Sequence, residues 1–212
     1  MRWSMVPRRI AALALAALLL AAVGCKREEA PPAPGPSAGA SEAGEPAPES
    51  VAKCKQAVGQ MKRQLVAALT EAIKNGAPAA IAVCSGLAPG IAQSVGRSAG
   101  VTVGRATRKP RNPANAAAGW RADALSQFES MVAAGRSLEG ATWASRLSDG
   151  TTAYAEPLVI QQVCLACHGK QLAPEVQAEL ATRYPADQAT GYAVGDLRGV
   201  AWAEIASAPA PQ

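Results

Sequence analysis

Apolar side chains recur every three or four positions between residues 49 and 75, which is the spacing of one face of an α-helix. We therefore predict one long amphipathic helix here, which Asn75-Gly76 ends. Its apolar face comprises Val51, Cys54, Val58, Met61, Leu65, Leu69 and Ala72.

A second helical pattern follows directly. Pro78 suits the first turn of a helix that extends to about Leu87. Pro89-Gly90 is expected to interrupt this pattern, and a short helix then continues to Val95. Residues 101–103 form a candidate strand.

The middle of the chain changes from loop to helix to strand. Residues 105–113 contain two prolines and no helical period, so we expect a loop or an edge segment. Residues 114–134 have the apolar spacing of a helix. The segments 140–147 and 151–160, joined by the turn 148–150, predict a β-hairpin.

Two more elements complete the pattern, namely a helix from Pro174 to about Thr182 and a strand at 196–205. Several helices therefore precede a mainly antiparallel sheet. The predicted fold class is α+β.

The N-terminal residues have the character of an export signal. Three arginines precede Ile10–Val23, an unbroken apolar run of 14 residues. This length suits a signal peptide and falls short of the roughly 20 residues of a membrane-spanning helix. Small residues then lead into Cys25, so we expect residues 1–24 to be a signal peptide of the lipoprotein type and Cys25 to be lipidated. Ordinary cleavage that leaves a free thiol is the alternative.

Residues 25–50 are predicted to form a disordered tether. Positions 30–50 contain only Ala, Pro, Gly, Ser and Glu, with six prolines and no bulky side chain to bury. The expected folded domain is residues 51–206, and a Pro-rich tail follows at 207–212.

Net charge limits the class of partner. The whole chain carries +5, and removal of the signal peptide lowers this to +2, because it takes away three arginines and no acidic residue. A chain so close to neutral is not expected to bind nucleic acid. We expect it on the periplasmic side of the cell envelope, lipid-anchored, with the outer membrane favoured because Lys26 rather than aspartate follows Cys25.

The chemistry centres on Cys164-Leu165-Ala166-Cys167-His168. Two cysteines separated by two residues and followed at once by histidine are typical of c-type haem attachment. The thiols add to the two porphyrin vinyl groups, and the adjacent imidazole binds the iron. The alternatives are a redox-active Cys-x-x-Cys or half of a zinc site with a chance histidine beside it, but zinc needs more ligands and His168 is the only histidine in the chain. We therefore predict one covalent haem c, with His168 as an iron ligand.

The second axial ligand of the iron cannot be another histidine. Met61 and Met131 are the methionines that remain after the signal peptide, and both fall on apolar helix faces, where packing is the expected role. Cys54 and Cys84 are left over. They could pair as a disulfide in an oxidising compartment, or Cys84 could bind the iron as a thiolate, and counting residues leaves both open.

Residues 55–206 resemble a family of exported single-haem proteins that were long labelled as of unknown function. The resemblance rests on the order of several short motifs over some 150 residues. They are 82–89 (AVCSGLAP), 104–107 (GRAT), 111–115 (RNPAN), 156–159 (EPLV), 164–169 (CLACHG), 184–192 (YPADQATGY) and 195–199 (GDLRG).

The resemblance implies a PAS-like fold and His/Cys ligation of the haem iron, as in the structurally known example of the family. By this match Cys84 stands at the position of the distal cysteine, and His168 is the proximal ligand. Cys54 belongs to no recognised motif, so the disulfide alternative stays open. A thiolate ligand stabilises ferric iron and is expected to lower the reduction potential relative to His/Met ligation.

The segment between positions 97 and 111, which follows Cys84 in the sequence, is rich in basic residues and contains no acidic residue. A haem carries two propionates, and arginine binds carboxylates in bidentate fashion. We therefore predict that one or two of Arg105, Arg108 and Arg111 bind propionates. Core packing and haem contact are alternative roles for Trp120, Phe128, Trp143 and Tyr154.

The leading functional hypothesis is a redox- or gas-responsive sensor module, and the alternative is a periplasmic electron carrier. An enzyme ranks below both, because catalysis at haem needs an open position and a distal acid–base group, and no spare histidine is present. The chain has no signalling module after the haem motif, so we expect a separate redox or signalling protein as its partner.

Overall fold

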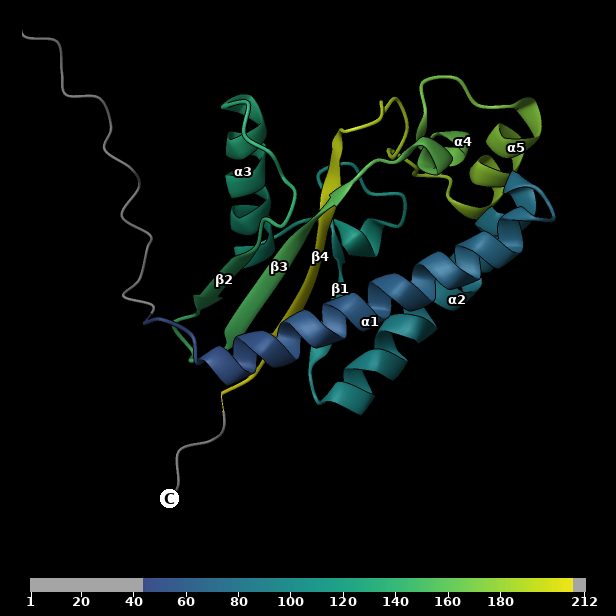
Figure 1. Cartoon of the computed structure of the whole chain (residues 1–212). Helices are drawn as coiled ribbons and strands as arrows, with labels where there is room; N and C mark the ends of the chain where they lie inside the picture. Colours follow the sequence, from purple (N-terminus) through teal and green to yellow (C-terminus); the bar gives the residue numbers. More distant parts are fainter. Residues whose placement is uncertain (1–43, 208–212) are drawn as a thin grey trace, which may run out of the picture. The chain divides into compact units, whose positions relative to one another are not determined.

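A computed structural model describes residues 44–207 (Figure 1). The predicted signal peptide, the lipidation site at Cys25, most of the tether and the residues after Ser207 lie outside the described residues.

Two long helices open the domain. Helix α1 spans Pro48–Ile73, in agreement with the predicted periodicity, and α2 spans Ala77–Ala99. The expected interruption at Pro89-Gly90 is wrong, because α2 continues through it. Proline inside a helix costs about 3 kcal/mol, but Ile91 and Val95 beyond it pack into the core against α1 and the sheet, and this burial outweighs the lost hydrogen bond. Within the described residues, α2 alone is long and apolar enough to span a membrane, and in this domain it packs against α1, α5 and β1.

Four strands form one antiparallel sheet in the order β1-β4-β3-β2. The strands are β1 Thr102–Ala106, β2 Trp143–Arg146, β3 Thr152–Val159 and β4 Leu197–Ile205. The predicted hairpin and the predicted last strand are therefore confirmed, and the first strand is longer than predicted.

Helices cover both faces of the sheet (Figure 1). Helices α1 and α2 lie on one face, and α3, Trp120–Ala133, lies on the other. Strand alternation divides the core accordingly, since Tyr154 packs in the cluster under α1 and the next residue, Ala155, packs in the cluster under α3. The α+β class, with a long N-terminal helix and flanking helices, is confirmed.

The predicted start of the third helix at residue 114 is wrong. A 3₁₀ turn at Pro113–Asn115 is followed by extended backbone at Ala116. Helix α3 begins at Trp120, directly after Gly119, whose φ of 53° is left-handed and breaks helical continuity.

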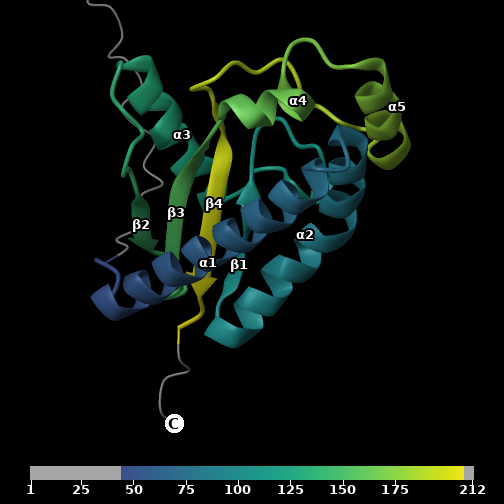
Figure 2. The ribbon, with the colours of Figure 1, turned by 45° about the vertical axis from the view of Figure 1, so that its right-hand side comes forward.

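The candidate site lies where β3 ends and β4 begins. A 3₁₀ turn at Gln162–Cys164, the single-turn helix α4 at Leu165–His168 and α5 at Pro174–Arg183 follow β3. Figure 2 shows α5 against the first half of α2, where Ile81, Val176 and Leu180 form a small core. The haem motif is thus brought beside α2.

Replacement of Gly199 by alanine is expected to destabilise the domain strongly. Its backbone has a φ of 156°, and a Cβ placed there would lie 2.4 Å from the Ala106 carbonyl oxygen. The strands cannot move apart without losing ladder hydrogen bonds, so Gly199→Ala should lower the free energy of unfolding by about 2–4 kcal/mol. Urea denaturation followed by circular dichroism would measure this effect.

Gly90→Ala is the matched control, because a Cβ at Gly90 meets no atom within 4 Å in the middle of α2. That change should be neutral or stabilising by up to about 1 kcal/mol. Equal stability of the two variants would contradict the close approach of β4 to β1.

Candidate functional site

The haem motif is held on a compact, well-defined turn. Cys164 ends a 3₁₀ turn, and Cys167 and His168 lie on α4 immediately after it. Gly169 ends α4, and a Cβ at this position would lie 2.6 Å from the Leu165 carbonyl oxygen. Only glycine therefore fits the close return of the chain that presents two thiols and an imidazole together.

The imidazole of His168 is held in one tautomer. Its Nδ1 lies 2.7 Å from the Ala189 carbonyl oxygen, and because a carbonyl only accepts, Nδ1 must carry the proton. Burial, together with the positive charge of Arg111, lowers the pKa of His168 to about 3. The ring is therefore neutral at physiological pH, with an unprotonated Nε2 free to bind a metal ion.

Cys84 is the third thiol of the site. It lies on α2, which contacts α4, and its charge interacts with that of Cys167. Burial raises the pKa of the Cys84 thiol, while the positive charges of Arg105 and Arg111 act to lower it. The structure therefore brings the predicted distal cysteine and the attachment motif together, with two guanidinium groups that favour a thiolate.

A disulfide between Cys54 and Cys84 is incompatible with this fold. Both are free thiols. Helices α1 and α2 form an antiparallel pair, and Cys54 is 12 positions farther from the connection than Cys84 is, which is roughly 18 Å along the helix axes. A disulfide requires Cα atoms about 4.4–6.8 Å apart. The alternative that the sequence left open is thereby removed.

Cys54 is expected to resist alkylation in the folded protein. It is fully buried, and burial raises the pKa of its thiol to about 11. Iodoacetamide at neutral pH should modify it on the order of 100-fold more slowly than in the urea-unfolded chain, because the thiolate is the nucleophile. Peptide mass spectrometry gives this rate, with half-buried Cys84 of the haem-free protein as the comparison. A peptide pair that links Cys54 to Cys84 would contradict the arrangement described here.

The three arginines that were predicted to bind propionates lie in different environments. Arg105 lies in β1, where its charge interacts with Cys84. Its side chain is solvent-accessible yet recessed among protein atoms, so desolvation lowers its pKa. Among residues 44–207 its guanidinium has no hydrogen-bond or ion-pair partner, although its backbone pairs with β4. Arg111 is also in the site, but it is already paired with Asp187, at 3.1 Å between Nη2 and Oδ2.

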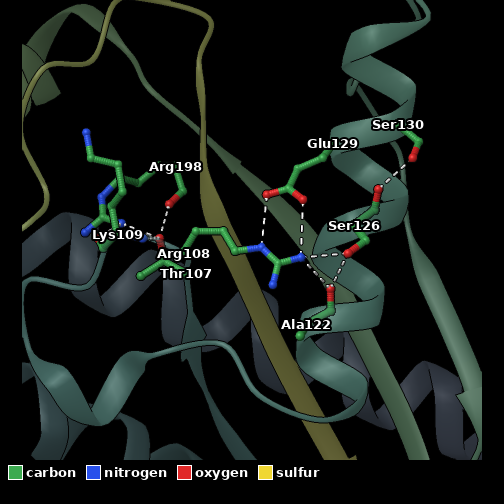
Figure 3. Close-up of polar contacts among 8 residues, drawn as sticks. All are labelled: Thr107, Arg108, Lys109, Ala122, Ser126, Glu129, Ser130 and Arg198. Atoms are coloured by element: carbon green, nitrogen blue, oxygen red, sulfur yellow. Dashed lines mark hydrogen bonds and ion pairs between the residues drawn. The ribbon is translucent and has the colours of Figure 1, made fainter.

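Arg108 does not join the site. Its guanidinium lies against α3, where it pairs with Glu129 and donates to Ser126 Oγ at 2.6 Å (Figure 3). Arg105 and Arg108 are three positions apart on a largely extended chain, so their side chains fall on opposite faces of the sheet. The expectation that Arg108 binds a propionate finds no support in this arrangement.

Sequence reasoning assigned no role to Arg198, which the structure brings to the site. Its Nη1 donates to Thr107 Oγ1 at 2.8 Å and to the Lys109 carbonyl oxygen at 3.0 Å, while its Nε is buried without a partner. Its guanidinium lies 5.4 Å from the ring of Tyr192, and its charge also lowers the pKa of His168. The sequence did contain a signal for this residue, because Arg198 lies within the motif 195–199 (GDLRG) of the family resemblance.

The other candidate side chains pack elsewhere. Met61 is buried in the core between α1 and the sheet, and Met131 packs in the cluster under α3. The four aromatic candidates Trp120, Phe128, Trp143 and Tyr154 also belong to these two clusters. Core packing therefore accounts for all six side chains.

The donor set fits a haem better than a lone metal ion. Among the described residues, no group of three or more His, Cys, Asp or Glu side chains could hold a metal ion alone. Two thiols at the attachment spacing, a neutral imidazole and the thiol of Cys84 suit a porphyrin and its iron. The unpartnered guanidinium of Arg105 and the free Nε of Arg198 supply donors for carboxylates.

Comparison with known proteins agrees with this geometry. The family model named Tll0287-like matches residues 42–205. The crystal structure of the cyanobacterial heme-protein Tll0287 superposes with a TM-score of 0.61 at 24% sequence identity, covering 78% of this chain and 99% of that chain, which shows a shared fold. No curated protein matches the chain. Because the family model extends over nearly the whole described domain, the chain belongs to the Tll0287-like family.

Proposed function

We propose that this protein binds one haem c, attached through Cys164 and Cys167 and bound at the iron by His168. The observation that carries the proposal is the single turn that presents both thiols beside a neutral imidazole of fixed tautomer. Membership of the Tll0287-like family supports it, as does the shared fold with a protein named as a heme-protein.

Cys84 is the proposed distal ligand. It is supported by its position on α2 facing the motif, by the two arginines that favour its thiolate, and by the burial of both methionines elsewhere. Bound haem would supply a one-electron centre, and a thiolate ligand would favour its ferric state. The protein's own contribution is to keep His168 neutral and oriented and to place Arg105 and Arg111 where their positive charges partly offset the effect of burial on the Cys84 thiol.

Arg105 is the favoured partner for a haem propionate. Among the described residues its guanidinium has no hydrogen-bond or ion-pair partner, and Arg198 offers a second donor at its Nε. Arg111 already donates to Asp187 and to the Cys167 carbonyl oxygen, which leaves it less available.

The physiological role that we propose is a redox- or gas-responsive module, exported and lipid-anchored through Cys25, that signals to a separate protein. The iron would be saturated by His168 and Cys84, so a change of state requires an electron or a competing ligand. An electron carrier that never releases Cys84 is the second candidate, because a haem iron with both axial positions filled is also suited to carry electrons between partners.

The full chain, produced in cells with the c-type haem maturation machinery, tests the proposal directly. The pyridine haemochrome spectrum should be that of a haem with both vinyl groups saturated, with one haem per chain that stays on the polypeptide after acid–acetone extraction. Haem that is extracted by the solvent, or a chain that carries none, would refute covalent binding.

A further inference from the structure

We propose that Arg111 and Asp187 are positioning residues for His168, and that together they hold its imidazole in place through a closed ring of hydrogen bonds. The inference rests on the proposed haem binding, since the imidazole matters as an iron ligand. It gives Arg111 a role different from the propionate contact that its sequence context suggested.

The ring can be followed atom by atom. Arg111 Nε donates to Asp187 Oδ2 at 3.1 Å, and Arg111 Nη2 donates to the Cys167 carbonyl oxygen. The backbone N–H of Ala189 donates to Asp187 Oδ1 at 2.7 Å. The Ala189 carbonyl oxygen accepts from His168 Nδ1 at 2.7 Å, and the peptide bond from Cys167 to His168 closes the ring.

The ion pair within this ring is well shielded from water. The side chains of Arg111 and Asp187 are only 12% and 10% exposed, whereas those of the pair Arg108–Glu129 are 45% and 43% exposed. A shielded pair with satisfied hydrogen bonds is more rigid than a surface pair, and removal of one partner leaves a buried charge unpaired. The pair is therefore suited to fix the two backbone segments that it joins.

Backbone hydrogen bonds also join the segment around residues 187–192 to the segments that carry Arg111 and His168, and the ion pair lies between these bonds. Gln188 N donates to the Pro110 carbonyl oxygen, and Tyr192 N donates to the His168 carbonyl oxygen, each at 3.0 Å. Between these anchors, Asp187 Oδ1 sets the orientation of the Ala189 N–H. The Ala189 carbonyl that accepts from His168 belongs to the next peptide unit, so the carboxylate restrains the backbone from which this carbonyl extends.

This dependence matters because the bond at Nδ1 tunes the ligand atom Nε2. A strong hydrogen bond from Nδ1 to a carbonyl fixes the ring orientation and raises the basicity of the imidazole. Both properties act on the reduction potential of a haem iron. Arg111 and Asp187 would thus act on the potential through His168, with no contact of their own to the iron.

The test uses the single histidine of the chain, which gives one ring signal after ¹⁵N-histidine labelling. In the full-length haem-loaded protein, reduced under carbon monoxide so that the six-coordinate ferrous iron is diamagnetic whether the gas or Cys84 fills the distal position, the His168 Nδ1 proton should exchange slowly with water. We expect Asp187→Asn to speed this exchange at least tenfold and to shift the reduction potential. Arg111→Lys keeps the net charge but loses the guanidinium fork, so it should produce both effects if position rather than charge is responsible.

Glu129→Gln is the matched control, because it breaks an arginine–carboxylate pair on the α3 side and should leave both readouts unchanged. Asp187→Glu keeps the carboxylate and should recover part of the slow exchange. Equal exchange rates in wild type, Asp187→Asn and Arg111→Lys would overturn the positioning role while haem binding stood. A wild-type chain without haem would instead refute the proposed function itself.

Discussion

Replacement of both Cys164 and Cys167 by serine is expected to abolish covalent haem attachment. Each thioether forms when a thiol S–H adds across a vinyl double bond, so that sulfur bonds to carbon and the hydrogen goes to the neighbouring carbon. A serine hydroxyl at neutral pH is a far weaker nucleophile. The double variant should therefore show almost none of the wild-type haem stain on a denaturing gel, and its mass should be that of the bare chain.

Single variants and one control sharpen this experiment. Cys164→Ser and Cys167→Ser should each retain one possible thioether, and their haemochrome spectra should shift toward that of a haem with one free vinyl group. Cys54→Ala removes a thiol that is fully buried under the sheet and should leave attachment unchanged. A haem-stained band in the double variant would show attachment at another residue and would refute the assigned motif.

The fold was predictable wherever the signal was local. The spacing of apolar residues predicted α1 correctly, and alternation around Ser148-Asp149-Gly150 predicted the β2–β3 hairpin. The predicted break at Pro89 was wrong because packing against α1 and the sheet keeps α2 continuous, and the local sequence does not reveal this packing. The predicted start of α3 was also wrong, because the helix begins only after Gly119, whose backbone conformation the sequence pattern does not reveal.

The candidate site divides in the same way. The attachment motif is five consecutive residues, so its chemistry was predictable from spacing alone. Cys84 lies 80 positions earlier, and only the family resemblance connected it with His168. Residue counting could not separate a distal thiolate from a disulfide with Cys54, whereas the antiparallel packing of α1 and α2 does so at once.

Closeness in the sequence did not predict the environments of the three arginines. Arg105, Arg108 and Arg111 are close together in the chain, yet the structure gives them three different environments: a recessed site near Cys84, a surface pair on α3 and a shielded pair beside His168. A count of basic residues predicts an electropositive region correctly. It does not predict which guanidinium groups remain unpaired, because the carboxylates that pair with Arg108 and Arg111 come from distant segments.

Cys84→Ala is expected to remove thiolate ligation from the ferric haem. The electron paramagnetic resonance spectrum of the wild type should show a low-spin thiolate signal, and this signal should be absent from the variant. Because the anionic sulfur stabilises ferric iron, its loss should raise the reduction potential by on the order of 100 mV. Cys54→Ala makes the same chemical change in the other long helix and should alter neither the signal nor the potential.

Reduction of the same two proteins under carbon monoxide then distinguishes the two proposed roles. Ferrous iron holds a thiolate weakly, so a sensor should exchange Cys84 for the gas on reduction, and the wild type should then bind it. An electron carrier should keep its ligand, so that carbon monoxide binds Cys84→Ala but not the wild type. A wild-type ferric signal that persists in Cys84→Ala would refute the thiolate assignment. Because Met61 and Met131 are packed in the two core clusters, the second axial ligand would then have to be a group other than Cys84 and these two methionines.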